Sequence, residues 1–147
     1  MKHVMQIKRL TKTAKMPVYS TELAACFDIH IDPSSPIKDH PNDPNAKIVG
    51  TGLAIAIEPG KALLLFSRSG HGFKDGIRLS NCVGVIDADY RQEVMVSLRC
   101  DGTNFRELKS DERIVQGMIV PADQVQFIEV DELSKTARTG GLGSTGL

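Results

Sequence analysis

Apolar residues recur along this chain in short runs that are separated by turn residues. Val94, Val96 and Leu98 follow a period of two residues, which is typical of a strand with one buried face. The segment Glu58-Pro59-Gly60 has the composition of a turn between two such runs. The predicted strands cover residues 4–10, 27–31, 53–57, 62–66, 94–99, 113–120 and 125–130, with residues 105–108 as a short pairing partner. Because no stretch of the sequence carries a long apolar stripe of helical period, the pattern predicts an all-β sandwich, jelly roll or barrel.

Helical and loop-like segments are few. One short helix is predicted near residues 69–73, although Gly70 and Gly72 weaken it. Residues 32–45 contain prolines at positions 33, 36, 41 and 44 and are predicted to form a surface excursion. Residues 134–147 are rich in glycine and poor in apolar side chains, which predicts a flexible, cationic tail. The predicted organisation is one β domain over residues 1–133, with a surface excursion at 32–50, followed by a flexible C-terminal arm over 134–147.

Length, charge and cysteine count narrow the class of protein. A chain of 147 residues suits one domain, which can bury roughly two-thirds of its unfolded surface without a disulfide or structural metal. The formal net charge is zero, which argues against bulk electrostatic binding to nucleic acid or to an anionic membrane. Cys26, Cys82 and Cys100 have no paired short spacing, so we expect a reducing cytoplasm rather than a disulfide framework or a zinc site. No signal peptide or spanning segment is expected from the hydropathy pattern.

The densest polar and glycine-rich cluster runs from residue 81 to residue 93. Asp87 and Asp89 lie two residues apart in it, so they share one face if the segment is extended. Carboxylates held close together, or one of them desolvated, favour the raised pKa of a general base. The alternative is a charged β-turn with no chemistry. The residues alone leave both interpretations open.

A second cluster, Ser67-Arg68-Ser69-Gly70, has the groups of a phosphate cradle. It offers a guanidinium fork, hydroxyl donors and open backbone N–H groups. A capped helix start explains the same residues and is the interpretation that this segment favours by itself. The segment at 111–116 mixes charges into a strand, which favours a solvated edge strand.

The remaining polar signals are weaker. The glycines at 141, 143 and 146 match a dinucleotide fingerprint in form, but only Leu147 follows them, so no helix can present its N-terminus to a pyrophosphate. The arm therefore either closes over an anion or is simply a disordered end. The histidines at positions 3, 30, 40 and 71 lack the spacing of metal ligands and are predicted to be non-catalytic, with His71 merely close to the cradle.

Taken in order, these segments resemble the trimeric dUTP pyrophosphatase (dUTPase) family. The five resembling motifs lie at residues 25–29, 68–70, 81–90, 112–116 and 140–146, so the resemblance spans nearly the whole chain. It implies a distorted jelly roll, the dUTPase-like β-clip, with at most one short helix. It also implies hydrolysis of dUTP to dUMP and pyrophosphate with Mg²⁺, in a homotrimer whose active sites are shared between subunits.

The resemblance also implies roles for individual residues. Asp87 is implied to be the general base that activates water, and Asp28 to orient Mg²⁺ through bound water. Tyr90 is implied to stack under the deoxyribose. The implied substrate-binding set is Arg68, Ser69, Gly70, Asn81, Gly84, Val85, Ile86, Tyr90, Met95, Gln116, Arg138, Gly141, Leu142, Gly143, Ser144 and Thr145. Within it, Ser144 and Thr145 are implied to close on the β- and γ-phosphates from the arm of a neighbouring subunit.

The sequence departs from the family pattern at five positions. Cys26 and Gln92 stand where the family usually has glycine, and Ser67 stands where it usually has proline. Leu142 stands in place of an aromatic residue that commonly stacks on uracil, and Arg138 falls one residue nearer the glycines than the usual arm arginine. Cys26 bears on the turn of the first motif, whereas Leu142 and Arg138 bear on closure of the arm. The base, sugar and phosphate positions are intact, so activity is expected.

Two other functions are compatible with the implied fold. The related dCTP deaminases place a catalytic glutamate about where Ser97 stands, which argues against deamination. A regulatory binding protein on the same fold is the second alternative, with residues 32–45 as its interaction surface.

Overall fold

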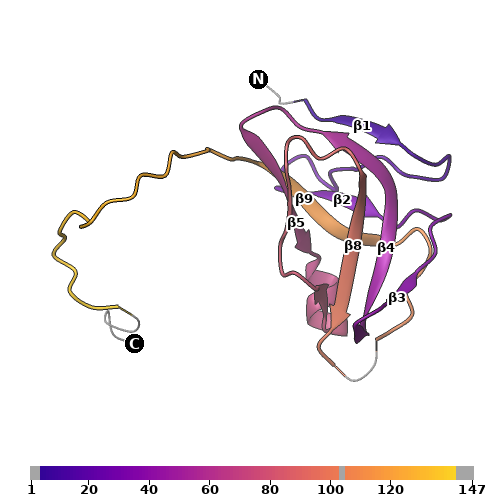
Figure 1. Cartoon of the computed structure of the whole chain (residues 1–147). Coiled ribbons are helices and arrows are strands. Elements are labelled where there is room, and N and C mark those ends of the chain that lie inside the picture. Colours follow the sequence, from indigo (N-terminus) through magenta and orange to yellow (C-terminus); the bar gives the residue numbers. More distant parts are fainter. Residues whose placement is uncertain (1–3, 103–104, 142–147) are drawn as a thin grey trace.

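Two antiparallel sheets build the molecule, as the computed structural model shows for residues 4–102 and 105–141 (Figure 1). The five-stranded sheet has the order β1 (Gln6–Arg9), β4 (Asp43–Ala56), β8 (Glu93–Cys100), β6 (Ile77–Leu79), with β3 (Lys38–His40) also pairing with β4. The four-stranded sheet has the order β2 (Phe27–His30), β9 (Arg113–Pro121), β5 (Lys61–Ser67), β7 (Gly84–Ile86). One short π-helix, η1 (His71–Asp75), follows β5. The predicted all-β fold with one short helix is therefore confirmed.

The core lies between the two sheets and follows the predicted alternation. On β8, Val94, Val96 and Leu98 are buried while Met95 is exposed, because successive side chains of a strand point to opposite faces. The four-stranded sheet contributes Leu63 from β5 in the same way. Further fully buried side chains are Ile31, Val49, Leu53, Leu65, Ile77, Ile114 and Val115. As the composition requires, aliphatic residues rather than aromatic ones fill this core.

Strand β4 is the longest element and is much longer than predicted. It pairs with β3 along its first half and with β1 along its second half, while β8 runs along its other side. The pairing with β8 shifts register between Gly50 and Ala54, and Gly52 has a positive φ of 64° there. Asp32 packs against this irregularity, accepting hydrogen bonds from Thr11 (2.8 Å) and Thr13 (2.5 Å). A buried carboxylate thus fastens the N-terminal segment to the bend in β4.

The loop-like prediction for residues 32–45 is wrong in part. Residues 38–40 form β3 and residues 43–45 open β4, so this region is a hairpin on the five-stranded sheet. Pro41 lies in the turn, and Pro44 precedes the pairing of β4 with β8, which begins at Ala46. Prolines at a turn and at a strand start remove no ladder hydrogen bond, so they do not prevent pairing.

Two predicted strands are absent from the part of the chain that the structure describes. Residues 105–108 have no regular structure, and residues 122–141 leave the sandwich as an extended tail (Figure 1). The tail residues 125–130 have the apolar pattern of a strand but are exposed, with Phe127 at 91%. An apolar pattern indicates a buried face, and none of the described residues of this chain buries the apolar side chains of the tail. The three-residue strands β3, β6 and β7 were too short to predict.

The helical segment begins at Ser69, as predicted, and runs two residues further than predicted. Ser69 and Gly70 are α-helical and continue as η1, which ends at Gly76 with a positive φ of 63°. That left-handed conformation suits glycine and stops the helix. Among the described residues, no helix is long and apolar enough to cross a membrane.

Candidate active site

The predicted phosphate cradle lies at the end of β5, where it is held by two neighbouring strands. Gln116 of β9 donates from Nε2 to the carbonyl of Ser67 over 2.9 Å. Arg68 donates from Nε to Oδ1 of Asp28, on β2, over 2.9 Å. A side chain added at Gly70 would meet no atom within 4 Å, so the cradle is open to solvent on that side. The structure thus brings together Asp28, Arg68, Gly70 and Gln116, which the sequence only placed in separate motifs.

Asp28 is the buried anion of this cluster. It is 6% exposed, and its Oδ2 accepts hydrogen bonds from Ser20 (2.8 Å) and Arg113 (3.2 Å). Burial raises the pKa of Asp28, but the hydrogen bond from Ser20 and the charges of Arg68 and Arg113 outweigh it, so the pKa is lowered. Asp28 is therefore ionised at neutral pH and orients two guanidinium groups.

A cavity of about 550 Å³ opens between β7 and β8. Of the predicted substrate-binding residues, its lining contains Asn81, Gly84, Val85, Ile86 and Met95. A side chain at position 84 would come within 3.1 Å of Cβ of Leu65, so glycine allows β7 to lie close against β5. The cavity floor is also polar, since the hydroxyls of Ser80 and Ser97 lie 2.8 Å apart. The structure therefore forms a slot of mixed polar and apolar character from the motif at 81–90 together with residues of other strands.

Seven lining residues of this cavity were not among the predicted site residues, and two of them come from a distant hairpin. His40 and Ile48 come from the β3–β4 hairpin and form part of the same wall. His40 accepts a hydrogen bond at Nδ1 from the backbone N–H of Asn42 over 3.2 Å, which leaves its proton on Nε2 in the neutral ring. Sequence analysis placed this segment in a loop, and nothing in the local pattern could bring it to residues that lie about forty positions further along.

Asp87 and Tyr90 lie outside that cavity. Asp87 and Asp89 are exposed and line a separate groove of about 1060 Å³ together with Lys61, Arg91 and Asp123. The segment is a turn rather than extended, because the backbone N–H of Tyr90 donates to the carbonyl of Asp87 over 3.2 Å, so the shared strand face that an extended segment would give is not formed. Tyr90 donates from its hydroxyl to the carbonyl of Glu93 over 2.8 Å, which fixes the ring at the start of β8.

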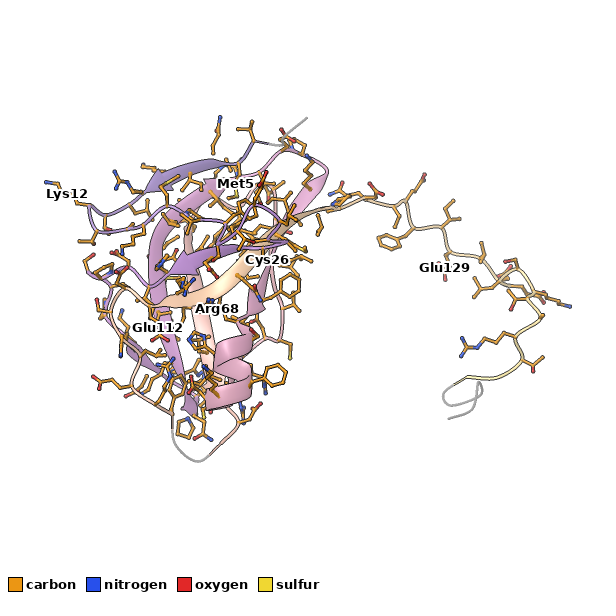
Figure 2. The ribbon with its side chains drawn as sticks, turned by 180° about the vertical axis from the view of Figure 1, so that it is seen from behind. Met5, Lys12, Cys26, Arg68, Glu112 and Glu129 are labelled. Carbon is orange, nitrogen blue, oxygen red and sulfur yellow. The ribbon has the colours of Figure 1, made fainter. Side chains whose placement is uncertain are left out.

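The tail residues stay apart from the rest of the predicted site. Arg138 donates from Nε to the carbonyl of Gly140 (3.0 Å) and from Nη2 to that of Gly141 (3.2 Å), so its described hydrogen bonds stay within the tail. Figure 2 shows Arg68 and Glu112 on the body of the molecule and Glu129 on the tail, far from both. The predicted positions Leu142, Gly143, Ser144 and Thr145 lie outside the described residues.

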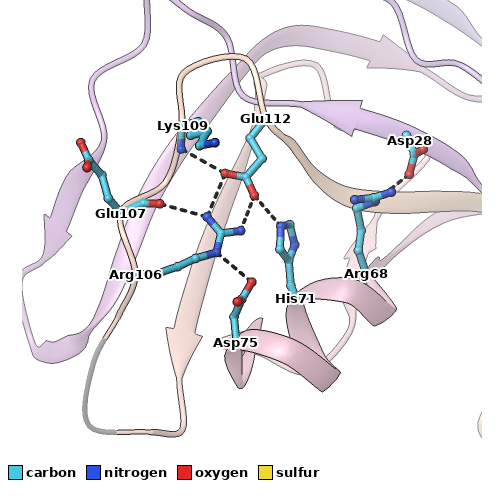
Figure 3. A network of polar contacts seen from close by, with 8 residues as sticks. All are labelled: Asp28, Arg68, His71, Asp75, Arg106, Glu107, Lys109 and Glu112. Carbon is cyan, nitrogen blue, oxygen red and sulfur yellow. Dashed lines mark hydrogen bonds and ion pairs between the residues drawn. The ribbon is translucent and has the colours of Figure 1, made fainter.

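A network of charges beside the cradle was missed by the sequence analysis. Glu112, predicted to carry a solvated charge, instead accepts hydrogen bonds from His71, Arg106 and the backbone N–H of Lys109 (Figure 3). Burial raises the pKa of Glu112, but these hydrogen bonds outweigh it and hold the pKa at about 2. Arg106 also donates to Asp75 at the end of η1 over 2.8 Å. His71 and Asp75 lie too far from Glu112 and Arg106 in the sequence for local patterns to join them.

The chain is similar in sequence to known proteins. The family model described as dUTPase matches residues 12–146. A protein of Nautilia profundicola named deoxyuridine 5'-triphosphate nucleotidohydrolase is 45% identical over 143 residues, which cover 97% of this chain and 98% of that protein. A protein of the same name from Hahella chejuensis is 41% identical over 141 residues, covering 95% and 91%.

Solved structures share the fold. A mutant dUTPase of Staphylococcus bacteriophage 80alpha, solved with dUpNHpp, superposes with a TM-score of 0.82 at 23% identity and covers 99% of this chain and 100% of that one. A mutant dUTPase from phage phi11 of S. aureus, whose structure concerns a structural Mg(II) ion, gives a TM-score of 0.74 at 20% identity, with coverage of 90% and 99%.

Proposed function

Because the chain belongs to the dUTPase family, we propose that it hydrolyses dUTP to dUMP and pyrophosphate. The observation that carries this proposal is the cavity between β7 and β8, which gathers Asn81, Gly84, Val85, Ile86 and Met95. Hydrolysis of dUTP limits the uracil available for incorporation into DNA and supplies dUMP for dTMP synthesis.

Pyrimidine recognition is assigned to this cavity. The side-chain amide of Asn81 and the backbone groups of residues 84–86 supply donors and acceptors for the uracil edge. The close approach of β7 to β5 at Gly84 leaves little space beside the base, which disfavours the extra methyl group of thymine. Tyr90 is assigned to the deoxyribose, where a ring held by its own hydrogen bond excludes a 2′-hydroxyl.

Phosphate binding is assigned to Arg68, Ser69, Gly70 and Gln116. Arg68 uses Nε for Asp28, and the two terminal nitrogens of its guanidinium fork suit phosphate oxygens. Gln116 donates one amide proton to the carbonyl of Ser67. The same amide nitrogen carries a second proton, which it can donate to a phosphate oxygen.

Asp87 is assigned the role of general base in the hydrolysis of dUTP. Its carboxylate takes a proton from a water molecule as the water oxygen attacks the α-phosphorus. The bond between that phosphorus and the oxygen bridging to the β-phosphate breaks, and pyrophosphate leaves with the electron pair. Positioning and charge stabilisation supply most of the rate in such a transfer.

Magnesium is the proposed cofactor, and Asp28 is the residue assigned to it. Mg²⁺ commonly keeps several waters and uses one or two carboxylates with substrate phosphates, so a single carboxylate beside the cradle fits it. The described residues hold no group of three or more histidine, cysteine, aspartate or glutamate side chains that could form an all-protein site. When bound, the ion neutralises and orients the triphosphate.

We further propose a homotrimer whose sites are shared between subunits. Asp87 and Tyr90 lie outside the pyrimidine cavity, and the hydrogen bonds described for Arg138 stay within the tail of one copy. The tail also carries an exposed apolar run, comprising Val125, Phe127, Ile128, Val130 and Leu133, which a neighbouring copy would bury. Residues 134–147 would then act as an arm that closes over the phosphates and excludes water. We also propose a cytoplasmic location, because the sequence spacing of the cysteines indicates no disulfide framework.

The test is pyrophosphate release from dUTP, with dTTP, dCTP and UTP alongside, with and without Mg²⁺. We expect Mg²⁺-dependent release from dUTP alone. Ammonia release from dCTP would instead indicate a deaminase, and a folded protein that turns over none of the four nucleotides would favour a regulatory binding protein. Molar mass in solution tests the assembly separately, and a monomer would contradict the shared site.

A further inference from the structure

Helix η1, which follows the phosphate cradle, is too short and too rich in glycine to hold its own shape. It spans five residues, includes Gly72, and is flanked by Gly70 and Gly76. Glycine disfavours helix by about 1 kcal/mol relative to alanine, and isolated helices shorter than roughly 12 residues are marginal in water. Contacts from outside the helix must therefore fix its position.

A closed ring of four side chains provides those contacts. His71, the first residue of η1, donates from Nε2 to Oε1 of Glu112 over 2.7 Å. Asp75, the last residue of η1, accepts from Nε of Arg106 over 2.8 Å. Arg106 in turn contacts both carboxylate oxygens of Glu112, through Nη1 at 3.1 Å and through Nη2 (Figure 3). Both ends of the helix are thus attached to the same ion pair.

His71 is buried, and its side chain forms a hydrogen bond with Glu112 there. The side chain is 5% exposed, and its Nδ1 is buried with no hydrogen-bond partner among the described residues. A carboxylate only accepts hydrogen bonds, so the neutral ring carries its proton on Nε2. Burying the unpaired Nδ1 costs free energy, which the Nε2 contact with Glu112 offsets.

The ring is joined directly to the cradle. His71 follows Gly70 in the chain, and the backbone N–H of Gly72 donates to the carbonyl of Arg68 over 3.1 Å. A shift of η1 would therefore shift the backbone of residues 68–70. The Arg68 side chain is held independently by Asp28, so the ring governs the backbone of the cradle rather than its guanidinium group.

We infer that this ring is a positioning clamp for phosphate binding, and that His71 is the positioning residue through which it acts on the cradle. The inference rests on the proposed function for its substrate. It predicts a selective effect, because none of the four ring residues lines the pyrimidine cavity. Loss of His71 should weaken binding of phosphates beyond the first while leaving recognition of the nucleoside intact.

The experiment compares wild type with His71→Leu, which keeps an apolar body of similar size, and with His71→Gln, whose amide nitrogen can replace Nε2 as donor to Glu112. Asp43→Asn, which weakens the Arg99–Asp43 ion pair on the other sheet, is the matched control. The readouts are KM and kcat for dUTP, titration calorimetry with dUMP and with magnesium pyrophosphate, and the melting temperature.

We expect His71→Leu to weaken pyrophosphate binding and to lower kcat/KM on the order of tenfold each, with dUMP affinity within twofold of wild type. His71→Gln should recover most of the loss, and Asp43→Asn should show none. Equal loss of dUMP and pyrophosphate affinity, or a lowered melting temperature with unchanged pyrophosphate affinity, would overturn the inference and leave His71 a purely structural residue.

Two further comparisons distinguish failure of this inference from misfolding of the variant and from failure of the proposed function. If His71→Leu does not fold, Asp75→Asn opens the ring at its more exposed end and is expected to show the same selective loss. If wild type fails to hydrolyse dUTP, the proposed function is wrong, whereas the pyrophosphate titrations still decide whether the ring positions a phosphate site. Wild type that binds no pyrophosphate would overturn the clamp as well.

Discussion

Arg68 and Asp28 are joined across the width of strand β9. Nε of Arg68, just after β5, donates to Oδ1 of Asp28, on β2, over 2.9 Å, and β9 lies between those two strands in the sheet. The same carboxylate also accepts from Arg113 of β9 over 3.2 Å. One anion therefore aligns two cations beside the open cradle.

Replacing Asp28 with asparagine should disable that alignment. The substitution removes the charge that holds both guanidinium groups, and a hydrogen bond to a charged group contributes about 1.5–3 kcal/mol. We expect kcat/KM for dUTP to fall at least tenfold and the melting temperature to fall by a few degrees. Steady-state kinetics and thermal unfolding measure the two effects. Unchanged kinetics at saturating Mg²⁺ would contradict the role assigned to Asp28.

Asp87→Asn should separate binding from chemistry. An amide cannot accept the proton of the attacking water, and a general base contributes typically 10²–10⁴-fold to a rate. We expect kcat to fall by about that factor while binding of a non-hydrolysable dUTP analogue changes little. Asp89→Asn is the control, because Asp89 lines the same groove without an assigned role. An equal loss in both variants would show that the groove, rather than Asp87, carries the effect.

Acid should unfold the wild-type protein partly through Glu112. Its pKa is about 2 in the folded protein against an ordinary value of 4.5. A lowered folded-state pKa gives stability that is fully present above pH 4.5 and is lost as pH falls towards 2. We expect Glu112→Gln to be less stable than wild type at pH 7, on the order of 2 kcal/mol, and the difference to shrink towards pH 2. Urea unfolding across this range measures it, and a difference that does not change with pH would contradict the ion pair.

Gly117→Ala should destabilise the sandwich. A Cβ at this position of β9 would lie 2.8 Å from Cε2 of Phe27 and 2.9 Å from Cδ1 of Leu63, both in the core. Overpacking of this kind costs typically 1–3 kcal/mol. Gly72→Ala is the matched control for stability, because a Cβ there meets nothing within 4 Å. Thermal unfolding that ranks the two variants in the opposite order would show that β9 moves freely to accept the methyl group.

Deleting residues 134–147 should affect turnover and not folding. The described residues of this segment are exposed, and the hydrogen bonds described for Arg138 are local to the tail. We expect an unchanged melting temperature and an unchanged number of subunits, with a fall of at least tenfold in kcat/KM for dUTP, since a closing arm excludes water from the reaction. Full activity of the shortened protein would remove the arm from the proposed mechanism.

Sequence patterns predicted the parts of this fold that depend on neighbouring residues. The alternation at Val94, Val96 and Leu98 predicted β8 because one face of that strand is buried by its own sandwich. The similar pattern around Phe127 predicted a strand that the structure does not contain, and no described residue covers these apolar side chains. Local patterns indicate that a face is apolar but not what covers it.

The candidate site was predicted to the same extent. Residues within one motif, such as Gly84 and Ile86, could be placed together from their order in the sequence. His40 and the Glu112–His71 pair could not, because their positions depend on strand pairing between distant segments. The polar character of Glu112 favoured a solvated edge strand. In the structure, His71 and Arg106 instead cover most of its carboxylate.

The attachments made by Glu112, Arg113 and Gln116 also constrain how this protein can evolve. The three residues hold His71, Asp28 and the carbonyl of Ser67, respectively. Because a shift of one residue sends the side chains of a strand to the opposite face, an insertion or deletion within this stretch would displace the residues on one side of it and break the attachments made there. A substitution, by contrast, removes a single attachment. The number of residues in this segment is therefore constrained as well as their identity.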